Sequence, residues 1–303
     1  MHVFPTIRKV APRLLLAYAA FFAAMQSFRL LLLPAIQHLF HTGDAATSLV
    51  RRTGIFCFIV LGYWAYVRLI EKRAVTELSL KPLDIAVGGL SGALLIGFAM
   101  ALLFAGGAYV ATAWRGLQSD LWGVACVIVI AALMEELVYR GILFRILETG
   151  WGTVPALWVS SGIFALMHLG NLDGHDTVPV VVTTMVSCVL TGALWTMVYV
   201  HSRNLWVSTA NHAAWNFTIL LSGLPLSGLE DWRKMAPLAG EYRAPDWLTG
   251  GIFGPEDSLV TLVLLSTTLV VLFRWARAKQ RLVTPSTPTA DGSTPPPEAV
   301  QHG

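Results

Sequence analysis

The chain has few charged residues and few cysteines for its length. Only 13% of its 303 residues are charged, whereas 55% are hydrophobic, and a soluble domain carries roughly a quarter charged residues. The cysteines Cys57, Cys126 and Cys188 all lie in apolar runs and show no CxxC spacing, so they do not predict a metal site. A net charge of +3 without a concentrated basic patch gives no reason to expect a nucleic-acid partner. The composition predicts a polytopic membrane protein.

Long apolar runs follow one another along most of the chain. A helix needs roughly 20 such residues to cross the hydrocarbon core of a bilayer. About eight candidate spans lie near residues 12–38, 54–70, 85–113, 121–147, 153–170, 178–201, 205–222 and 257–275. We therefore expect an all-α membrane bundle of about eight transmembrane helices, with membrane lipids around it.

The basic residues predict how this bundle is oriented. The N-terminal run is apolar after a basic start, but no small-residue cleavage site follows it, so we interpret it as a retained first transmembrane helix. An even number of spans places both termini on one side. More Lys and Arg residues fall on the side of the termini than on the other, which by the positive-inside rule predicts cytoplasmic termini in a plasma (inner) membrane.

The same pattern divides the chain into parts. Between the last two spans, the sequence mixes Pro, Gly, Trp and charges of both signs, which predicts a structured extracytoplasmic loop; the end of the chain is rich in Pro and Thr and is expected to be disordered. The expected parts are N-terminal transmembrane helices (1–120), a four-helix core (121–222), the loop (223–256), a last transmembrane helix (257–281) and the tail (282–303).

One apolar run, AALMEELVYRG at residues 131–141, ends in three charges. A charge within a bilayer costs on the order of 3 kcal/mol and normally faces a partner inside the bundle. Glu136 and Arg140 are four residues apart, so on a helix they share a face and can pair. Glu135 is rotated by about 100° from Glu136 and has no basic residue three or four positions away. Glu135 is therefore the carboxylate that needs another explanation.

The following helices supply polar groups that Glu135 can meet. Phe164 and His168 are four residues apart in one predicted helix, and His212 and Asn216 are four apart in another, so each pair projects from one helix face. Taken singly, each polar residue can be an interhelical hydrogen-bond partner. Together they predict hydrolysis: a buried carboxylate can act as general base on a water held with His168, while His212 and Asn216 donate hydrogen bonds to an oxyanion.

These residues resemble a known family. The stretches EELVYR (135–140), FALMH (164–168) and HAAWN (212–216) are similar to the EExxxR, FxxxH and HxxxN/D motifs of the CAAX-protease and bacteriocin-processing family of intramembrane endopeptidases, the group of the Rce1-type proteases. The resemblance covers about residues 121–222. It implies a glutamate-dependent protease of a membrane-associated protein or peptide, in which Glu135 and His168 activate water, His212 and Asn216 form the oxyanion hole, and Glu136 and Arg140 brace the site.

Other functions remain open on the sequence alone. Two His and one Glu also match a catalytic zinc site, although no HExxH motif is present; we favour catalysis without a cofactor. The polar set is also compatible with a non-catalytic membrane scaffold or immunity-type protein that keeps these residues for folding. A proton-coupled transporter also uses buried Glu and His, but no repeated halves are visible.

Overall fold

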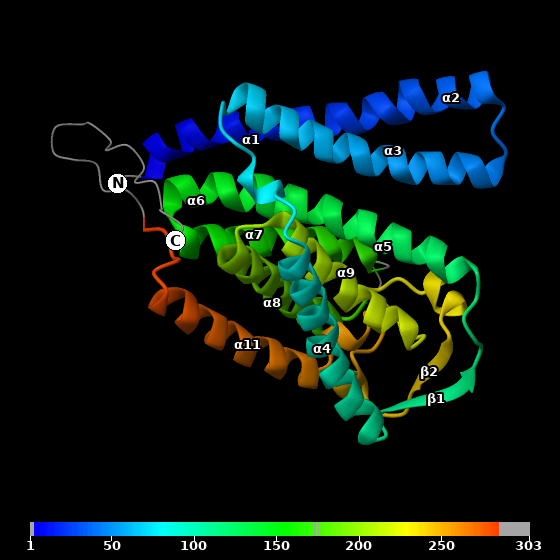
Figure 1. Cartoon of the computed structure of the whole chain (residues 1–303). Helices are drawn as coiled ribbons and strands as arrows, with labels where there is room; N and C mark the ends of the chain where they lie inside the picture. The colour runs from blue at the N-terminus through cyan, green and yellow to red at the C-terminus, as the bar shows by residue number, and fades with distance from the viewer. Residues whose placement is uncertain (1–2, 173, 175, 285–303) are drawn as a thin grey trace.

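A computed structural model of the chain describes residues 3–172, 174 and 176–284, and it shows a bundle of long helices with a small sheet at one end (Figure 1). The α-helices are α1 Val3–Ser27, α2 Leu33–Phe40, α3 Asp44–Ala65, α4 Pro82–Ala105, α5 Asp120–Glu136, α6 Arg145–Trp151, α7 Thr153–His168, α8 Val178–Ser202, α9 Leu205–Leu221, α10 Asp246–Thr249 and α11 Leu259–Ala278. The π-helical segments are η1 Phe28–Leu32, η2 Tyr66–Ile70 and η4 Leu137–Phe144; short 3₁₀ turns are η3 Thr76–Leu78, η5 Leu169–Asn171, η6 Asp231–Met235 and η7 Pro255–Asp257. The strands are β1 Tyr109–Trp114 and β2 Leu238–Tyr242.

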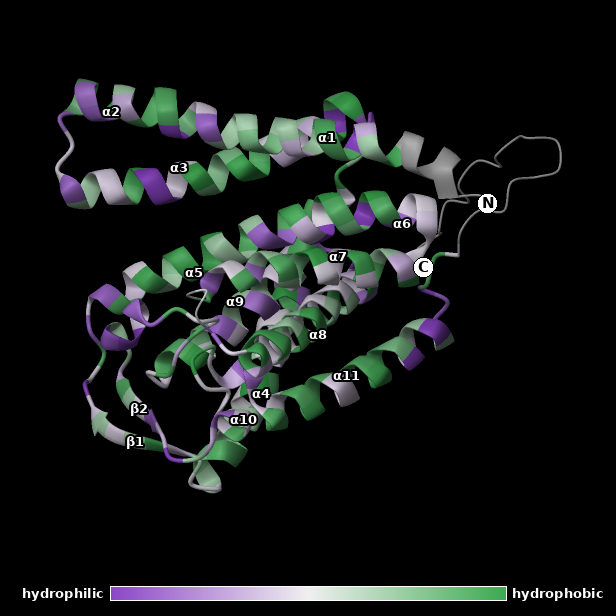
Figure 2. Cartoon of the chain, turned by 180° about the vertical axis from the view of Figure 1, so that it is seen from behind, coloured by the Kyte–Doolittle hydropathy of each residue, from purple (hydrophilic) through white to green (hydrophobic). Residues whose placement is uncertain are grey.

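The expected all-α membrane fold is confirmed. Among the described residues, seven helical segments are long and apolar enough to cross a membrane. The remaining predicted span corresponds to α9, which has 17 residues and is therefore about 26 Å long. It packs against α4, α5 and α8. Figure 2 shows that the helices are mostly hydrophobic and that hydrophilic residues concentrate in the connections and near the end of α11.

The predicted span 85–113 is wrong at its C-terminal end. Helix α4 ends at Ala105, and Gly107 follows with a φ of 73°, a left-handed conformation that glycine adopts without strain. The chain then forms β1, which pairs antiparallel with β2 from Tyr109 opposite Tyr242 to Trp114 opposite Leu238. The loop predicted at 223–256 is therefore tied to the end of α4 by a two-stranded sheet.

Both described ends of the chain reach the corner between α6 and α7. Arg13 of α1 donates a hydrogen bond to Thr149 (3.1 Å), and the N–H of Thr153 donates to the carbonyl of Val283 (2.9 Å). His168 lies at the other end of α7, about 23 Å from Thr153 along the helix. Figure 1 shows the sheet at this far end, opposite α6. The expected disordered tail, 282–303, lies outside the described residues from position 285 onward.

A cluster of arginines around Glu71 joins the first helices to α6. The Glu71 carboxylate accepts hydrogen bonds from Arg13 (3.0 Å), Arg73 (3.0 Å) and Arg145 (2.8 Å). Burial raises the pKa of Glu71, but the three guanidinium groups outweigh this effect and bring the pKa down to about 2. Glu71 therefore stays ionised and links α1 and α6 to the segment after η2.

Helices α4 and α9 approach each other closely because α4 has small residues on the shared face. A Cβ atom at Gly92 would lie 2.1 Å from the carbonyl oxygen of Asn211. The Asn211 amide donates hydrogen bonds to the Gly88 carbonyl (3.0 Å) and to Ser91 Oγ (3.0 Å). Close backbone approach and interhelical hydrogen bonds are what hold helices together where lipid removes the hydrophobic driving force. This contact, which we call the α4–α9 seam, fixes α9 within the bundle.

Candidate active site

The predicted catalytic residues surround one cavity of about 80 Å³. Glu135 comes from α5, His168 from the end of α7, and His212 and Asn216 from α9. The cavity lies in the half of the bundle away from the corner between α6 and α7. Polar residues of α8 also line it, namely Ser187, Cys188 and Thr191. The structure thus brings together residues that are up to 81 positions apart in the sequence.

Glu135 lies between the two histidines. Its Oε2 atom is 3.9 Å from His168 Nε2 and 3.8 Å from His212 Nε2. These separations are longer than a direct hydrogen bond, and among the described residues Oε2 has no hydrogen-bond partner although it is buried. The Glu135 side chain is 26% exposed. The predicted leftover carboxylate is therefore the group that faces the cavity.

Hydrogen bonds orient both imidazole rings. His168 Nδ1 lies 2.9 Å from the carbonyl oxygen of Phe164, and His212 Nδ1 lies 3.1 Å from Glu136 Oε1. Since both partners are acceptors, each Nδ1 carries the proton, and in a neutral ring each Nε2 is an acceptor. Both Nε2 atoms are the ones directed at Glu135. Backbone and carboxylate partners that fix the tautomer in this way are typical of functional histidines.

Glu136 and Arg140 form the predicted ion pair, and the pair is fully buried. Arg140 Nη1 is 2.8 Å from Glu136 Oε1, with side-chain exposures of 1% and 0%. Arg140 also donates to the Gly192 carbonyl (2.9 Å). The sequence did not reveal that Glu136 Oε1 also accepts from His212, because that contact joins helices 76 residues apart. Glu136 therefore holds both the arginine and one of the cavity histidines.

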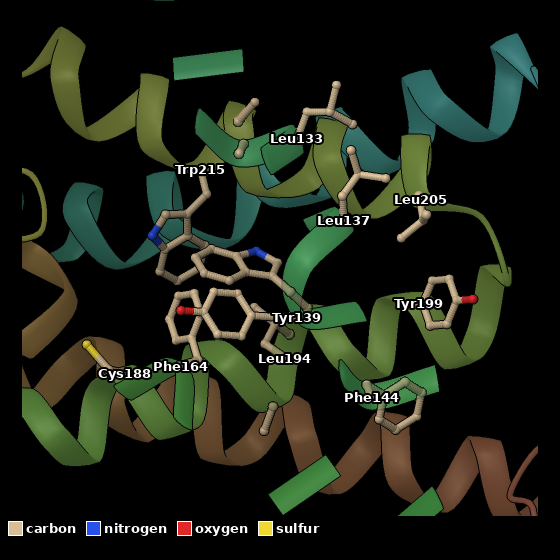
Figure 3. Packing of buried hydrophobic residues seen from close by; sticks show 14 of the residues in the cluster. Leu133, Leu137, Tyr139, Phe144, Phe164, Cys188, Leu194, Tyr199, Leu205 and Trp215 are labelled. Atoms are coloured by element: carbon tan, nitrogen blue, oxygen red, sulfur yellow. The ribbon is translucent and has the colours of Figure 1, made fainter. Parts of the chain in front are cut away.

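Aromatic rings hold the rest of the cavity wall. Trp195 stacks on His212 with ring centroids 3.5 Å apart, and Phe164 packs on His168 at 4.0 Å. Figure 3 shows Tyr139, Phe164 and Trp215 gathered in this region, with Cys188 beside Phe164. The Arg140 guanidinium lies 5.2 Å from the Phe164 ring and 5.6 Å from the Trp195 ring, within the range of cation–π attraction. The rings leave the imidazoles little freedom to turn.

The loop between α9 and α11 closes the cavity on its remaining side. Its contributions are Leu226, Ser227, Leu229, Trp232, Phe253 and Glu256. Sequence reasoning assigned this loop no site residue, and Glu256 gave no signal because it stands in a polar segment among other charges. In the fold Glu256 is buried, 3% exposed. The cavity thus holds a second carboxyl group that the sequence did not single out.

The atoms that could hold a metal ion do not form a tight ligand cluster among the described residues. Among the residues that the structure describes, no group of three or more His, Cys, Asp or Glu side chains is placed to hold one. The Glu135, His168 and His212 atoms converge, but each His–Glu separation is close to 4 Å. We therefore derive no chemical step through a metal.

Comparison with known proteins identifies the segment that carries the cavity. Residues 117–218 match the model of the Rce1-like family, type II CAAX prenyl endopeptidases. All six of the residues singled out from the sequence, Glu135, Glu136, Arg140, His168, His212 and Asn216, lie within the match. No curated protein and no solved structure matches the chain. Residues 117–218 of this integral membrane protein therefore form a segment similar to the type II CAAX prenyl endopeptidases.

Proposed function

We propose that the protein is a glutamate-dependent intramembrane endopeptidase that hydrolyses a peptide bond of a membrane-associated protein or peptide. The observation that carries the proposal is the position of Glu135 Oε2 between His168 Nε2 and His212 Nε2, in a cavity within the family-matched segment. Glu135 Oε2 and, in a neutral ring, His168 Nε2 are acceptors. Such a set is suited to taking protons from a water molecule.

In the proposed reaction, water adds to the carbonyl carbon of the substrate peptide. Glu135 accepts one proton from this water, with His168 orienting it through Nε2. The carbon–nitrogen bond then breaks, and Glu135 passes the proton to the departing amine nitrogen. The products are a carboxyl terminus and an amine, so atoms and charge balance without a cofactor.

His212 and Asn216 are the proposed oxyanion donors. The Asn216 amide donates in any state of the site, and its Oδ1 is buried without a hydrogen-bond partner among the described residues. His212 Nε2 donates only when the ring is protonated, because Nδ1 already donates to Glu136. The Glu136 carboxylate accepts from Nδ1 at 3.1 Å and so orients the ring. Glu136 and Arg140 therefore act as positioning residues in this proposal.

The orientation in the membrane determines from which side a substrate arrives. With both termini in the cytoplasm of a plasma (inner) membrane, the cavity lies in the extracytoplasmic half of the bundle. A reporter fused after residue 284 and active only in the cytoplasm tests this placement. An inactive reporter at this position, together with activity of a second reporter that works only after export, would reverse the orientation and with it the proposed side of entry.

The test of the proposed activity compares cells that produce the native chain with cells that produce Glu135→Gln. We expect at least one membrane or secreted protein to show a new terminus only with the native chain, at equal amounts of inserted protein. Glu230→Gln is the matched control, because Glu230 is exposed and lies outside the cavity. If the native and Glu135→Gln cells have the same protein termini, the polar set serves a scaffold role instead.

Treatment with a metal chelator tests the alternative that the same protease depends on zinc. We expect cleavage by purified protein to persist after treatment with a metal chelator. Loss of cleavage that zinc alone restores would assign Glu135, His168 and His212 to a metal instead of to water activation.

A further inference from the structure

The cavity is too small for the substrate that the proposed function requires, although solvent reaches the Glu135 side chain, which is 26% exposed. Its volume of about 80 Å³ corresponds to roughly two or three water molecules at about 30 Å³ each. Ligand pockets typically measure about 300–1,000 Å³. A peptide therefore reaches Glu135 only if one wall of the cavity moves. The walls from α5, α7, α8 and α9 are packed helices, which leaves the loop as the wall that can open.

Within that loop, Ser227 makes the contacts that close the cavity. Its N–H and its Oγ hydroxyl both donate to Glu256 Oε2, at 2.9 and 2.7 Å. Its carbonyl accepts from Asn171 Nδ2 at 2.8 Å. Asn171 ends the short η5 turn that follows His168 directly. Ser227 is thus tied to a buried acid on one side and to the end of the histidine-bearing helix on the other.

The backbone of this turn is held in a conformation that needs support. Ser227 has a φ of 49° and the following Gly228 a φ of 80°. A left-handed conformation is uncommon for a residue other than glycine and persists when surrounding contacts enforce it. The contacts at Ser227 are those to Glu256 and Asn171. The Gly228 N–H also donates to the Phe253 carbonyl (2.8 Å), so loss of the Ser227 contacts loosens the side of the turn that faces Glu256 while the Gly228 side stays attached.

Glu256 is firmly anchored, in contrast to the turn that it holds. Its neighbour Asp257 accepts hydrogen bonds from Thr184 (2.6 Å) and Ser187, both on α8. Glu256 and Asp257 are each 3% exposed. The η7 turn is therefore fixed to the bundle, and opening at the Ser227–Glu256 contact moves residues 226–229 rather than Glu256.

We propose that residues 226–229 form a gate over the catalytic cavity and that Glu256 is a positioning residue that holds this gate closed through Ser227. That the gate admits a peptide substrate rests on the proposed protease function, whereas the way it closes follows from the Ser227 contacts. It assigns a role to a residue outside the family-matched segment 117–218. Substrate entry breaks the Ser227–Glu256 hydrogen bonds, and product release is followed by their re-formation.

Cys188 provides a probe of the gate that does not depend on catalysis. It lines the cavity and is buried, whereas Cys57 and Cys126 are exposed. Replacing Cys57 and Cys126 by Ser leaves Cys188 as the reporter in the full chain. The experiment measures its rate of modification in detergent by a small reagent, methyl methanethiosulfonate, and by a bulky one, fluorescein maleimide. The ratio of the bulky to the small rate reports access, because a change in thiol ionisation affects both reagents.

We expect Glu256→Ala and Ser227→Ala each to raise this ratio, Glu256→Ala by about tenfold, the change that loss of hydrogen bonds of ordinary net strength produces in an opening equilibrium. Glu256→Gln retains an acceptor for Ser227 and should raise the ratio less than threefold. Glu230→Gln, an exposed acid in the same loop, should leave it unchanged.

The gate is overturned if the ratio of bulky to small modification rates is unchanged in both Ser227→Ala and Glu256→Ala. It is also overturned if Glu256→Gln and Glu256→Ala raise the ratio equally, because that result would indicate an effect of charge. If the Glu256→Ala variant does not insert into the membrane, the ratios of Ser227→Ala and Glu256→Gln decide the test. Glu135→Gln should keep the native ratio. An inactive protein with a working gate therefore contradicts only the protease proposal, and an active protein without the expected ratios contradicts only the gate.

Discussion

Replacing Glu136 by Gln is expected to destabilise the protein by about 3 kcal/mol, because Arg140 would remain buried without its carboxylate partner. Arg140 is 1% exposed and pairs with Glu136 at 2.8 Å. Breaking a buried ion pair costs roughly 3–5 kcal/mol. The hydrogen bond to the Gly192 carbonyl and the aromatic rings around Arg140 remain in the variant, which places the expected cost at the lower end.

A double-mutant cycle with Arg140→Met isolates the pair. Removing both charges leaves no uncompensated buried ion, so we expect the double variant to be more stable than Glu136→Gln alone by about 2 kcal/mol. The measurement is the free energy of unfolding in mixed micelles of dodecyl maltoside and sodium dodecyl sulfate. The pair Glu230–Arg233, at 3.1 Å and with Glu230 65% exposed, is the control near the surface, and its cycle should give a coupling of less than about 1 kcal/mol.

Additive effects of Glu136→Gln and Arg140→Met would refute this reasoning, because they would show that the two charges do not stabilise each other.

Glu136→Gln also tests the role of Glu136 at the cavity. Loss of its carboxylate weakens the hydrogen bond that orients His212, so cleavage should fall even where the protein remains folded.

Three further predictions concern separate parts of the fold. Asn216→Ala should lower kcat/KM about 10²- to 10³-fold in cleavage assays by removing one oxyanion donor, and a loss below threefold would remove Asn216 from that role. Gly92→Ala places a Cβ 2.1 Å from the Asn211 carbonyl and should cost about 1–3 kcal/mol by overpacking, whereas Gly43→Ala, with open space around the Cβ, should be nearly neutral. Burial raises the pKa of Asp257 from 3.8 to about 7, so the folded state binds an extra proton between these two values, and stability should fall by up to about 1.4 kcal/mol per pH unit for this group as pH rises through the range. Burial also raises the pKa of Glu256, so pH titration of unfolding should show a smaller slope in Asp257→Asn than in the native chain, and an unreduced slope would contradict the assignment.

The sequence was most informative where the constraint is local. Apolar runs of membrane length predicted the spans, because lipid requires them one helix at a time. Four-residue spacings correctly paired Glu136 with Arg140 and placed His212 and Asn216 on one face of α9. The end of α4 was predicted too far along, since the strand residues after Gly107 are as apolar as a helix and become a strand only by pairing with β2.

What the sequence could not predict depends on contacts between distant segments. The bond from His212 to Glu136 and the closure of the cavity by Ser227 and Glu256 join residues far apart in the chain. Glu256 in particular stands in a polar loop where an acid is unremarkable. Its burial results from the fold of the 223–257 segment, which carries no periodic pattern from which an inward-facing position can be recognised.

The α4–α9 seam has a consequence for how such an enzyme acquires new substrates. Asn211 anchors α9 to α4 immediately before His212, so the cavity-lining face of α9 keeps one rotation regardless of what enters the cavity. Changes that adapt the protein to another peptide are therefore tolerated in the 223–257 loop and not in the seam. A library that randomises the other cavity-facing positions of the loop and leaves Ser227, Glu256 and the seam residues Gly88, Ser91 and Gly92 untouched is the rational starting point for altering its selectivity.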